Sequence, residues 1–102
     1  MVLDAAVHEY LHLITRTRPW MQPREQEVLT AFCDWLQRQP VRATLENVSP
    51  IFATTYAKAQ HLSPDEHDEL LMVLHNLCLW AYQNGLIVSN PFSLVRLVSC
   101  AR

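Results

Sequence analysis

Guanidinium groups are the side chains of this sequence with the clearest chemical potential. Arg16, Arg18 and Arg24 stand close together, and Arg42 follows further along the chain. A guanidinium group can bind a phosphate through two parallel hydrogen bonds. Solvated arginines that serve only solubility are the alternative, and the residues by themselves leave both interpretations open.

Residues that could perform catalysis or hold a metal ion are poorly grouped. His8 and His12 are four residues apart, a spacing that lets two imidazoles on one helix reach the same metal ion, but no third ligand is positioned with them. Cys33 and Cys78 fall in apolar helical patterns, which is typical of thiols in a core. Since no paired acid and base occurs either, we expect no metal, no cofactor, no small-molecule substrate and no enzymatic activity.

The composition is that of one folded domain with little charge. Half of the 102 residues are apolar and 18% are charged, with a formal net charge of −2, so the basic excess of domains that bind nucleic acid through net charge is missing. Three cysteines without a C-x-x-C pair favour a reduced, cytoplasmic compartment. The opening residues include Asp4 and no basic stretch, and no apolar run is long enough for a membrane span. We therefore expect neither an export signal nor a membrane anchor.

The spacing of apolar residues predicts the first two helices. Apolar residues recur at three- and four-residue steps from Val2 to Ile14, and the period breaks over residues 15–21, which predicts a loop there. Pro23 suits the first position of a second helix. The apolar pattern of that helix ends before Pro40, which cannot continue it.

Cap signals define the other two helices. Ser49-Pro50 predicts the start of a short helix that runs to about Ala59. Ser63-Pro64-Asp65-Glu66 is a capping box, in which the serine hydroxyl and the glutamate carboxylate each accept a backbone N–H, and it opens the longest apolar helix. Asn84-Gly85 predicts a left-handed cap at the end of that helix. Residues 92–98 are expected to form a short final turn or helix.

Together these patterns predict an all-α fold, a compact bundle of four main helices with the long last helix at its centre. The chain contains a single glycine, which argues against a sheet because tight strand connections rely on glycine turns. We expect one domain over residues 1–92, followed by a tail or linker over residues 93–102.

The order of these parts resembles the SAM-like core-binding domain that precedes the catalytic domain of tyrosine recombinases of the phage-integrase type. The most specific piece is residues 79–92, Leu-Trp-Ala-Tyr-Gln-Asn-Gly-Leu-Ile-Val-Ser-Asn-Pro-Phe. Supporting pieces are Leu-Ser-Pro at 62–64, Thr-Leu-Glu-Asn-Val-Ser-Pro at 44–50, and the Phe32, Trp35, Leu36 pattern near the end of the second helix. The resemblance covers nearly the whole chain.

The resemblance implies a non-catalytic module that clamps one face of double-stranded DNA during site-specific recombination and integration. In that family a separate catalytic domain clamps the other face and supplies an arginine, a His-x-x-Arg motif and a tyrosine, a set that this sequence does not contain. Arg16, Arg18 and Arg24 lie where the family meets DNA, and Arg42 is a further candidate phosphate contact. The chain therefore looks like a fragment or a solitary relative, with residues 93–102 leading toward an absent catalytic domain.

One segment departs from the family. Residues 65–69, Asp-Glu-His-Asp-Glu, open the last long helix where the family usually offers polar or basic side chains to DNA. Carboxylates repel phosphate, although they stabilise a helix N-terminus. The alternative function is therefore a helical protein–protein interaction module that docks a partner, or a second copy, through this acidic face or an apolar patch with Trp20. We expect Trp20 and Met21 to staple the entry of the second helix by packing against later apolar residues, and an exposed Trp20 would favour the alternative.

Overall fold

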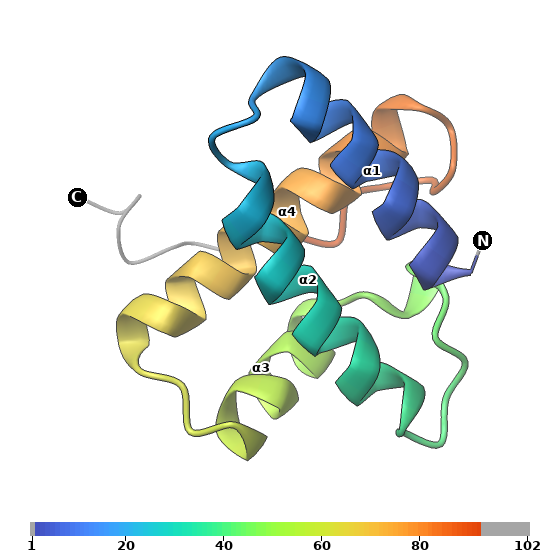
Figure 1. The fold of residues 1–102 in the computed structure, drawn as a ribbon. Coiled ribbons are helices and arrows are strands. Elements are labelled where there is room, and N and C mark those ends of the chain that lie inside the picture. Colours follow the sequence, from blue (N-terminus) through green and yellow to red (C-terminus); the bar gives the residue numbers. More distant parts are fainter. Residues whose placement is uncertain (1, 93–102) are drawn as a thin grey trace. The chain divides into compact units, whose positions relative to one another are not determined.

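The computed structural model describes residues 2–92, and its regular elements there are helices (Figure 1). In chain order they are α1 (Leu3–Thr17), α2 (Gln22–Gln37), the 3-10 helix η1 (Leu45–Asn47), α3 (Pro50–Ala59) and α4 (Pro64–Gln83). Among the described residues, extended backbone pairing is confined to an isolated bridge between Val2 and Thr44. The predicted all-α fold class with four main helices is confirmed.

The chain divides into two compact units, residues 1–47 and residues 48–102. The first unit holds α1, α2 and η1, and the second holds α3 and α4. The predicted domain limits, 1–92 with a tail from 93 onward, stay predictions. Residues 93–102, with most of the final turn expected at 92–98, lie outside the described residues.

In the first unit, α1 and α2 form an antiparallel hairpin. Each helix buries one apolar stripe, made of Leu3, Val7, Tyr10 and Ile14 on α1 and of Leu29, Phe32 and Leu36 on α2. The Gln37 side-chain amide donates to Asp4 Oδ2 at 2.7 Å, which ties the end of α2 to the start of α1. The end of α1 and the start of α2 therefore lie together at the opposite end of the hairpin.

Helix α1 is longer than the apolar pattern predicted. The expected loop over residues 15–21 is wrong for its first three residues, because the helix continues to Thr17. The Thr15 and Thr17 hydroxyls each donate, at 2.9 Å, to the carbonyl four residues earlier. Pro19 disfavours helical geometry only at the residue before it, and Arg18, with a φ of −142° and a ψ of 65°, ends the helix there.

In the second unit both helices begin with the predicted serine caps. At the start of α3, Ser49 Oγ accepts the Phe52 N–H at 3.4 Å. At the start of α4, Ser63 Oγ accepts the Glu66 N–H at 3.2 Å, and Glu66 Oε1 accepts the Ser63 N–H at 2.9 Å. This reciprocal pair is the predicted capping box, and each such cap contributes about 1 kcal/mol to helix stability.

Helix α4 ends on the predicted glycine cap. Gly85 has a φ of +72°, its N–H donates to Tyr82 O at 3.1 Å, and the Leu86 N–H donates to Ala81 O at 2.9 Å. These two bonds satisfy carbonyls that the last helical turn would otherwise leave unpaired. The chain then returns to α4, since Asn90 Nδ2 lies 3.3 Å from a ring nitrogen of His75.

Helix α3 ends in the same way on a histidine. His61 has a φ of +55°, its N–H donates to Lys58 O at 3.2 Å, and the Leu62 N–H donates to Ala57 O at 3.0 Å. The sequence gives no glycine or asparagine to mark this cap. A histidine in the left-handed region is strained, because its Cβ crowds the backbone.

The two caps should respond to substitution in opposite directions. Gly85→Ala should lower the free energy of unfolding by about 1 kcal/mol, and the cost is conformational, because no heavy atom lies within 4 Å of an added Cβ. His61→Gly should raise it by up to about 1 kcal/mol, since relief of left-handed strain exceeds the extra entropy of an unfolded glycine. Urea unfolding of both variants measures the changes. Equal destabilisation by both would contradict this account of the α3 end.

Candidate nucleic-acid interface

Three of the four candidate arginines meet at one end of the α1–α2 hairpin. Arg16 lies in the last turn of α1 and is exposed, Arg18 is the residue that ends α1, and Arg24 is exposed in the first turn of α2. The connection between the helices is only residues 18–21. The three arginines, which are close together in the sequence, are therefore also close together in the fold, at the end of the hairpin where α1 connects to α2.

Arg42 lies at the other end of the hairpin. The residue after it, Ala43, accepts the Leu3 N–H at 2.9 Å, which places this loop beside the start of α1. The length of α1, 15 residues at about 1.5 Å each, separates it from Arg16 by about 20 Å. Arg42 is exposed, but it does not share a surface with the other three.

Arg24 has a neighbouring carboxylate. Its guanidinium forms an ion pair with Glu27 at 3.0 Å, and the two side chains are 50% and 71% exposed. An ion pair this exposed contributes little to stability, so a phosphate could compete for the guanidinium. Glu27 and Asp34 also line a shallow pocket of about 470 Å³ on the outer side of α2, which places negative charge next to Arg24.

A buried carboxylate inside the hairpin is the polar feature that sequence reasoning missed. Glu25 is only 3% exposed, and its Oε1 accepts a hydrogen bond from the buried Tyr10 hydroxyl at 3.0 Å. Its other oxygen, Oε2, is buried without a hydrogen-bond partner. The available signal was spacing, because Glu25 stands four residues before Leu29 and so continues the apolar stripe of α2.

Arg18 interacts with this buried pair. Burial and the Glu25 carboxylate raise the pKa of the Tyr10 hydroxyl, whereas the charge and hydrogen bond of the Arg18 side chain lower it. Arg18 is half-buried, while Arg16 is exposed. Of the three clustered arginines, Arg18 is therefore the one connected to the interior of the hairpin.

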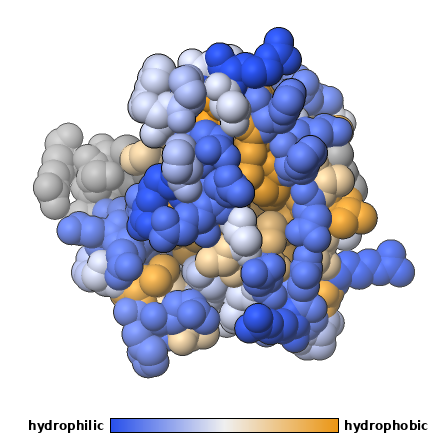
Figure 2. Space-filling model, viewed as in Figure 1, coloured by the Kyte–Doolittle hydropathy of each residue, from blue (hydrophilic) through white to orange (hydrophobic). Residues whose placement is uncertain are grey.

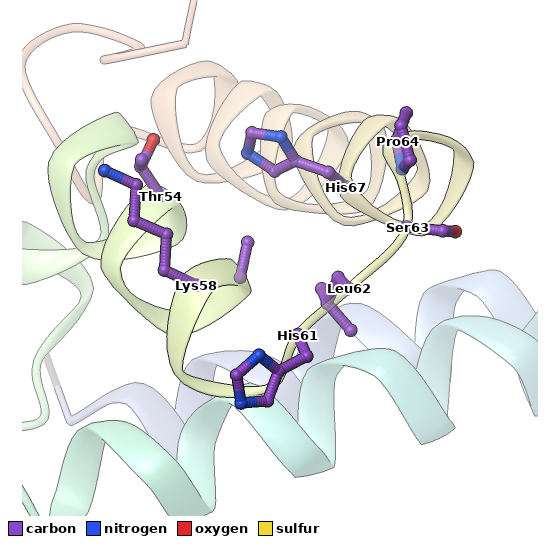
Figure 3. A pocket seen from close by; sticks show the side chains of 8 residues that line it. Thr54, Lys58, His61, Leu62, Ser63, Pro64 and His67 are labelled. Carbon is purple, nitrogen blue, oxygen red and sulfur yellow. The ribbon is translucent and has the colours of Figure 1, made fainter.

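The acidic segment 65–69 lies at the start of α4 in the second unit. Glu66 is engaged in the capping box with Ser63. Beside it, α3 and α4 border an open pocket of about 470 Å³, drawn in Figure 3, whose lining includes Lys58, His61 and His67. His67 Nε2 is buried there without a hydrogen-bond partner.

Trp20 does not pack as predicted. Its side chain is 74% exposed, whereas Met21, the N-cap residue of α2, is half-buried. Hydrophilic residues predominate on the face in Figure 2, with hydrophobic ones exposed among them. Trp20 is thus an exposed aromatic side chain next to the clustered arginines.

Within residues 2–92, no group of three or more His, Cys, Asp or Glu side chains is placed to hold a metal ion. The helices in this part of the chain are also too short or too polar to cross a membrane. Cys33 and Cys78 are buried thiols, in agreement with their predicted place in the core. Comparison of the chain with protein-family models, with curated proteins and with solved structures finds no match.

The Tyr10–Glu25 pair should have a measurable effect on stability. Tyr10→Phe should lower the free energy of unfolding by about 1–3 kcal/mol, because it leaves a buried carboxylate without its hydrogen bond. The double variant Tyr10→Phe, Glu25→Met should recover most of this loss, since both polar partners are then replaced by apolar groups. Urea unfolding tests both, with the exposed Tyr82→Phe as control. A double variant no more stable than Tyr10→Phe would contradict the account.

The core thiols should be protected by folding. Burial raises the pKa of the Cys33 thiol to about 12, with Asp4 and Asp34 adding to the shift, and burial alone raises the pKa of Cys78 to about 12. The thiolate is the reactive form, so a Cys100→Ser variant should react with Ellman's reagent at pH 8 only after urea unfolds it. Because both pKa values are raised on folding, this contribution to stability is fully present below about pH 9 and is lost toward pH 12. Rapid labelling of the folded variant would show that these thiols are accessible.

Proposed function

We propose that this chain is a non-catalytic DNA-binding module of a tyrosine recombinase, or of a relative of one, which clamps duplex DNA for site-specific recombination or integration. The resemblance in residues 44–50, 62–64 and 79–92 supports this proposal. The positions of those residues in the fold also support it, because they form the N-terminal caps of α3 and α4 and the glycine turn after α4.

The observation that carries the proposal is the grouping of Arg16, Arg18 and Arg24 at one end of the α1–α2 hairpin. Phosphate contacts position a protein on a duplex without reading its sequence, which suits a module that acts as half of a clamp. A local group of arginines can do this although the chain carries a formal net charge of −2. The buried thiols Cys33 and Cys78 are in keeping with a reducing, cytoplasmic setting for this activity.

The acidic start of α4 is compatible with the proposal. Glu66 has a structural role in the capping box, and carboxylates near a helix N-terminus stabilise it by about 0.3–1 kcal/mol each. This face belongs to the second unit, whereas the arginines belong to the first. The proposal therefore assigns phosphate contact to the first unit and leaves residues 65–69 a role in stability.

Binding to duplex DNA should be weak and steeply dependent on salt. Three arginine–phosphate contacts correspond to a slope of log affinity against log salt of about −2.7, and to a loss of about 40-fold in affinity between 50 and 200 mM salt. Replacing Arg16, Arg18 and Arg24 together by alanine should remove most of this binding and of its salt dependence. Fluorescence anisotropy with a labelled duplex at low salt measures both quantities.

The matched control is Arg38→Ala. Arg38 is also exposed, but it follows the last residue of α2, at the other end of that helix from Arg24. This substitution removes one positive charge, as each single substitution in the cluster does, so it should change affinity much less than Arg16→Ala, Arg18→Ala or Arg24→Ala alone. Equal losses in Arg38→Ala and in these single variants would indicate nonspecific attraction, and an unchanged affinity in the triple variant would refute the proposed function.

The exposure of Trp20 supports a second candidate, a helical protein-docking module. An indole that is 74% exposed is the kind of aromatic side chain that dominates the energetics of protein interfaces. Binding to a protein partner, or self-association, should then persist or strengthen at high salt and be lost in Trp20→Ala. Sedimentation at 50 and 500 mM salt distinguishes this function from phosphate binding, which weakens as salt rises.

A further inference from the structure

The end of α1 carries two arginines with different surroundings. Tyr10, Ile14 and Arg18 follow one another at four-residue steps, so they continue the buried stripe of α1 into the connection with α2. Arg16 lies off this stripe and is exposed. The register of the helix thus places Arg18, and not Arg16, on the buried side of α1.

The Tyr10 hydroxyl is itself held in place. It donates to Glu25 Oε1 at 3.0 Å inside the hairpin, and both residues are almost fully buried. Arg18 is half-buried, and its charge and a side-chain hydrogen bond lower the pKa of the Tyr10 hydroxyl against the opposing effects of burial and Glu25, which places the guanidinium near this hydroxyl. The buried Glu25 of α2 is therefore linked, through the Tyr10 hydroxyl of α1, to the half-buried guanidinium of Arg18.

We propose that Tyr10 and Glu25 are positioning residues, which hold the half-buried Arg18 guanidinium in one orientation so that its outward N–H groups meet a backbone phosphate of duplex DNA. The inference rests on the proposed function and deepens it. A guanidinium has five N–H donors in a planar fork, so a contact with Tyr10 leaves donors for a phosphate. Arg18 is then the principal contact of the cluster, because its side chain is ordered before DNA arrives.

The side chains of the three arginines must undergo different changes when a phosphate binds. Arg16 is exposed and has to be ordered on binding, and Arg24 has to exchange Glu27 for the phosphate. Ordering a long side chain at an interface costs enough to weaken affinity by about 2- to 12-fold. Arg18 avoids this weakening of affinity because its side chain is already ordered. In Tyr10→Phe the Arg18 side chain would have to be ordered on binding, so affinity should fall.

The first test uses the free protein. NMR relaxation of the arginine Nε–H groups should give Arg18 an order parameter near that of ordered backbone, about 0.85, and Arg16 a value below about 0.6. In Tyr10→Phe, Arg18 should become as mobile as Arg16. If that variant is too unstable, Tyr10→Phe combined with Glu25→Met should show the same change. An Arg18 that is already as mobile as Arg16 in the wild type overturns the inference.

The second test is a double-mutant cycle on DNA binding. Tyr10→Phe should weaken affinity for duplex DNA by about 2- to 12-fold in the wild-type background and should have no further effect in Arg18→Ala. The control is Tyr56→Phe, which removes the hydroxyl of a buried tyrosine from α3 and should leave affinity unchanged. A merely structural role for Tyr10 would weaken binding equally in both backgrounds, and that outcome overturns the inference.

These outcomes separate the inference from the proposed function. A wild-type protein that binds no duplex DNA at low salt overturns both. DNA binding that depends on the arginines but is insensitive to Tyr10→Phe overturns the positioning of Arg18 alone.

Discussion

Glu25 places a carboxylate inside the α1–α2 hairpin, and the geometry of the first unit depends on how that group is accommodated. A buried carboxylate needs hydrogen-bond partners to offset its lost hydration, and the Tyr10 hydroxyl supplies one at 3.0 Å. This bond joins the middle of α1 to the first turns of α2. The chain reverses at residues 18–21, where Pro19 ends α1, and the three clustered arginines lie at that reversal.

Charge is distributed so that its two signs have separate structural roles. Arg16 and Arg18 lie at the C-terminal end of α1, where the helix dipole favours positive charge, and Arg24 lies in the first turn of α2. The carboxylates of residues 65–69 gather at the start of α4, where the helix dipole and a capping box use them. A net charge of −2 therefore hides a local basic surface in the first unit, and the proposed contact with phosphate depends on that local surface.

The second unit is defined by its helix ends. Ser49 and Ser63 begin α3 and α4, and residues with positive φ, His61 and Gly85, follow their ends. Because each cap pairs backbone groups that a helix terminus leaves unpaired, the helices begin and end sharply. This explains how short segments, residues 60–63 and 84–92, can redirect the chain.

The sequence by itself determined the features that depend on residues close together in the chain. Helix periodicity, the serine caps and the glycine turn are local, so the all-α class and most helix bounds could be predicted. Tertiary structure alone decided the burial of Glu25, the exposure of Trp20 and the separation of Arg42 from the other arginines. These features depend on residues that are distant in the sequence and lie close together only in the fold. Glu25, for example, looks like a surface carboxylate in the sequence, and it is buried because Tyr10 of α1 donates a hydrogen bond to it.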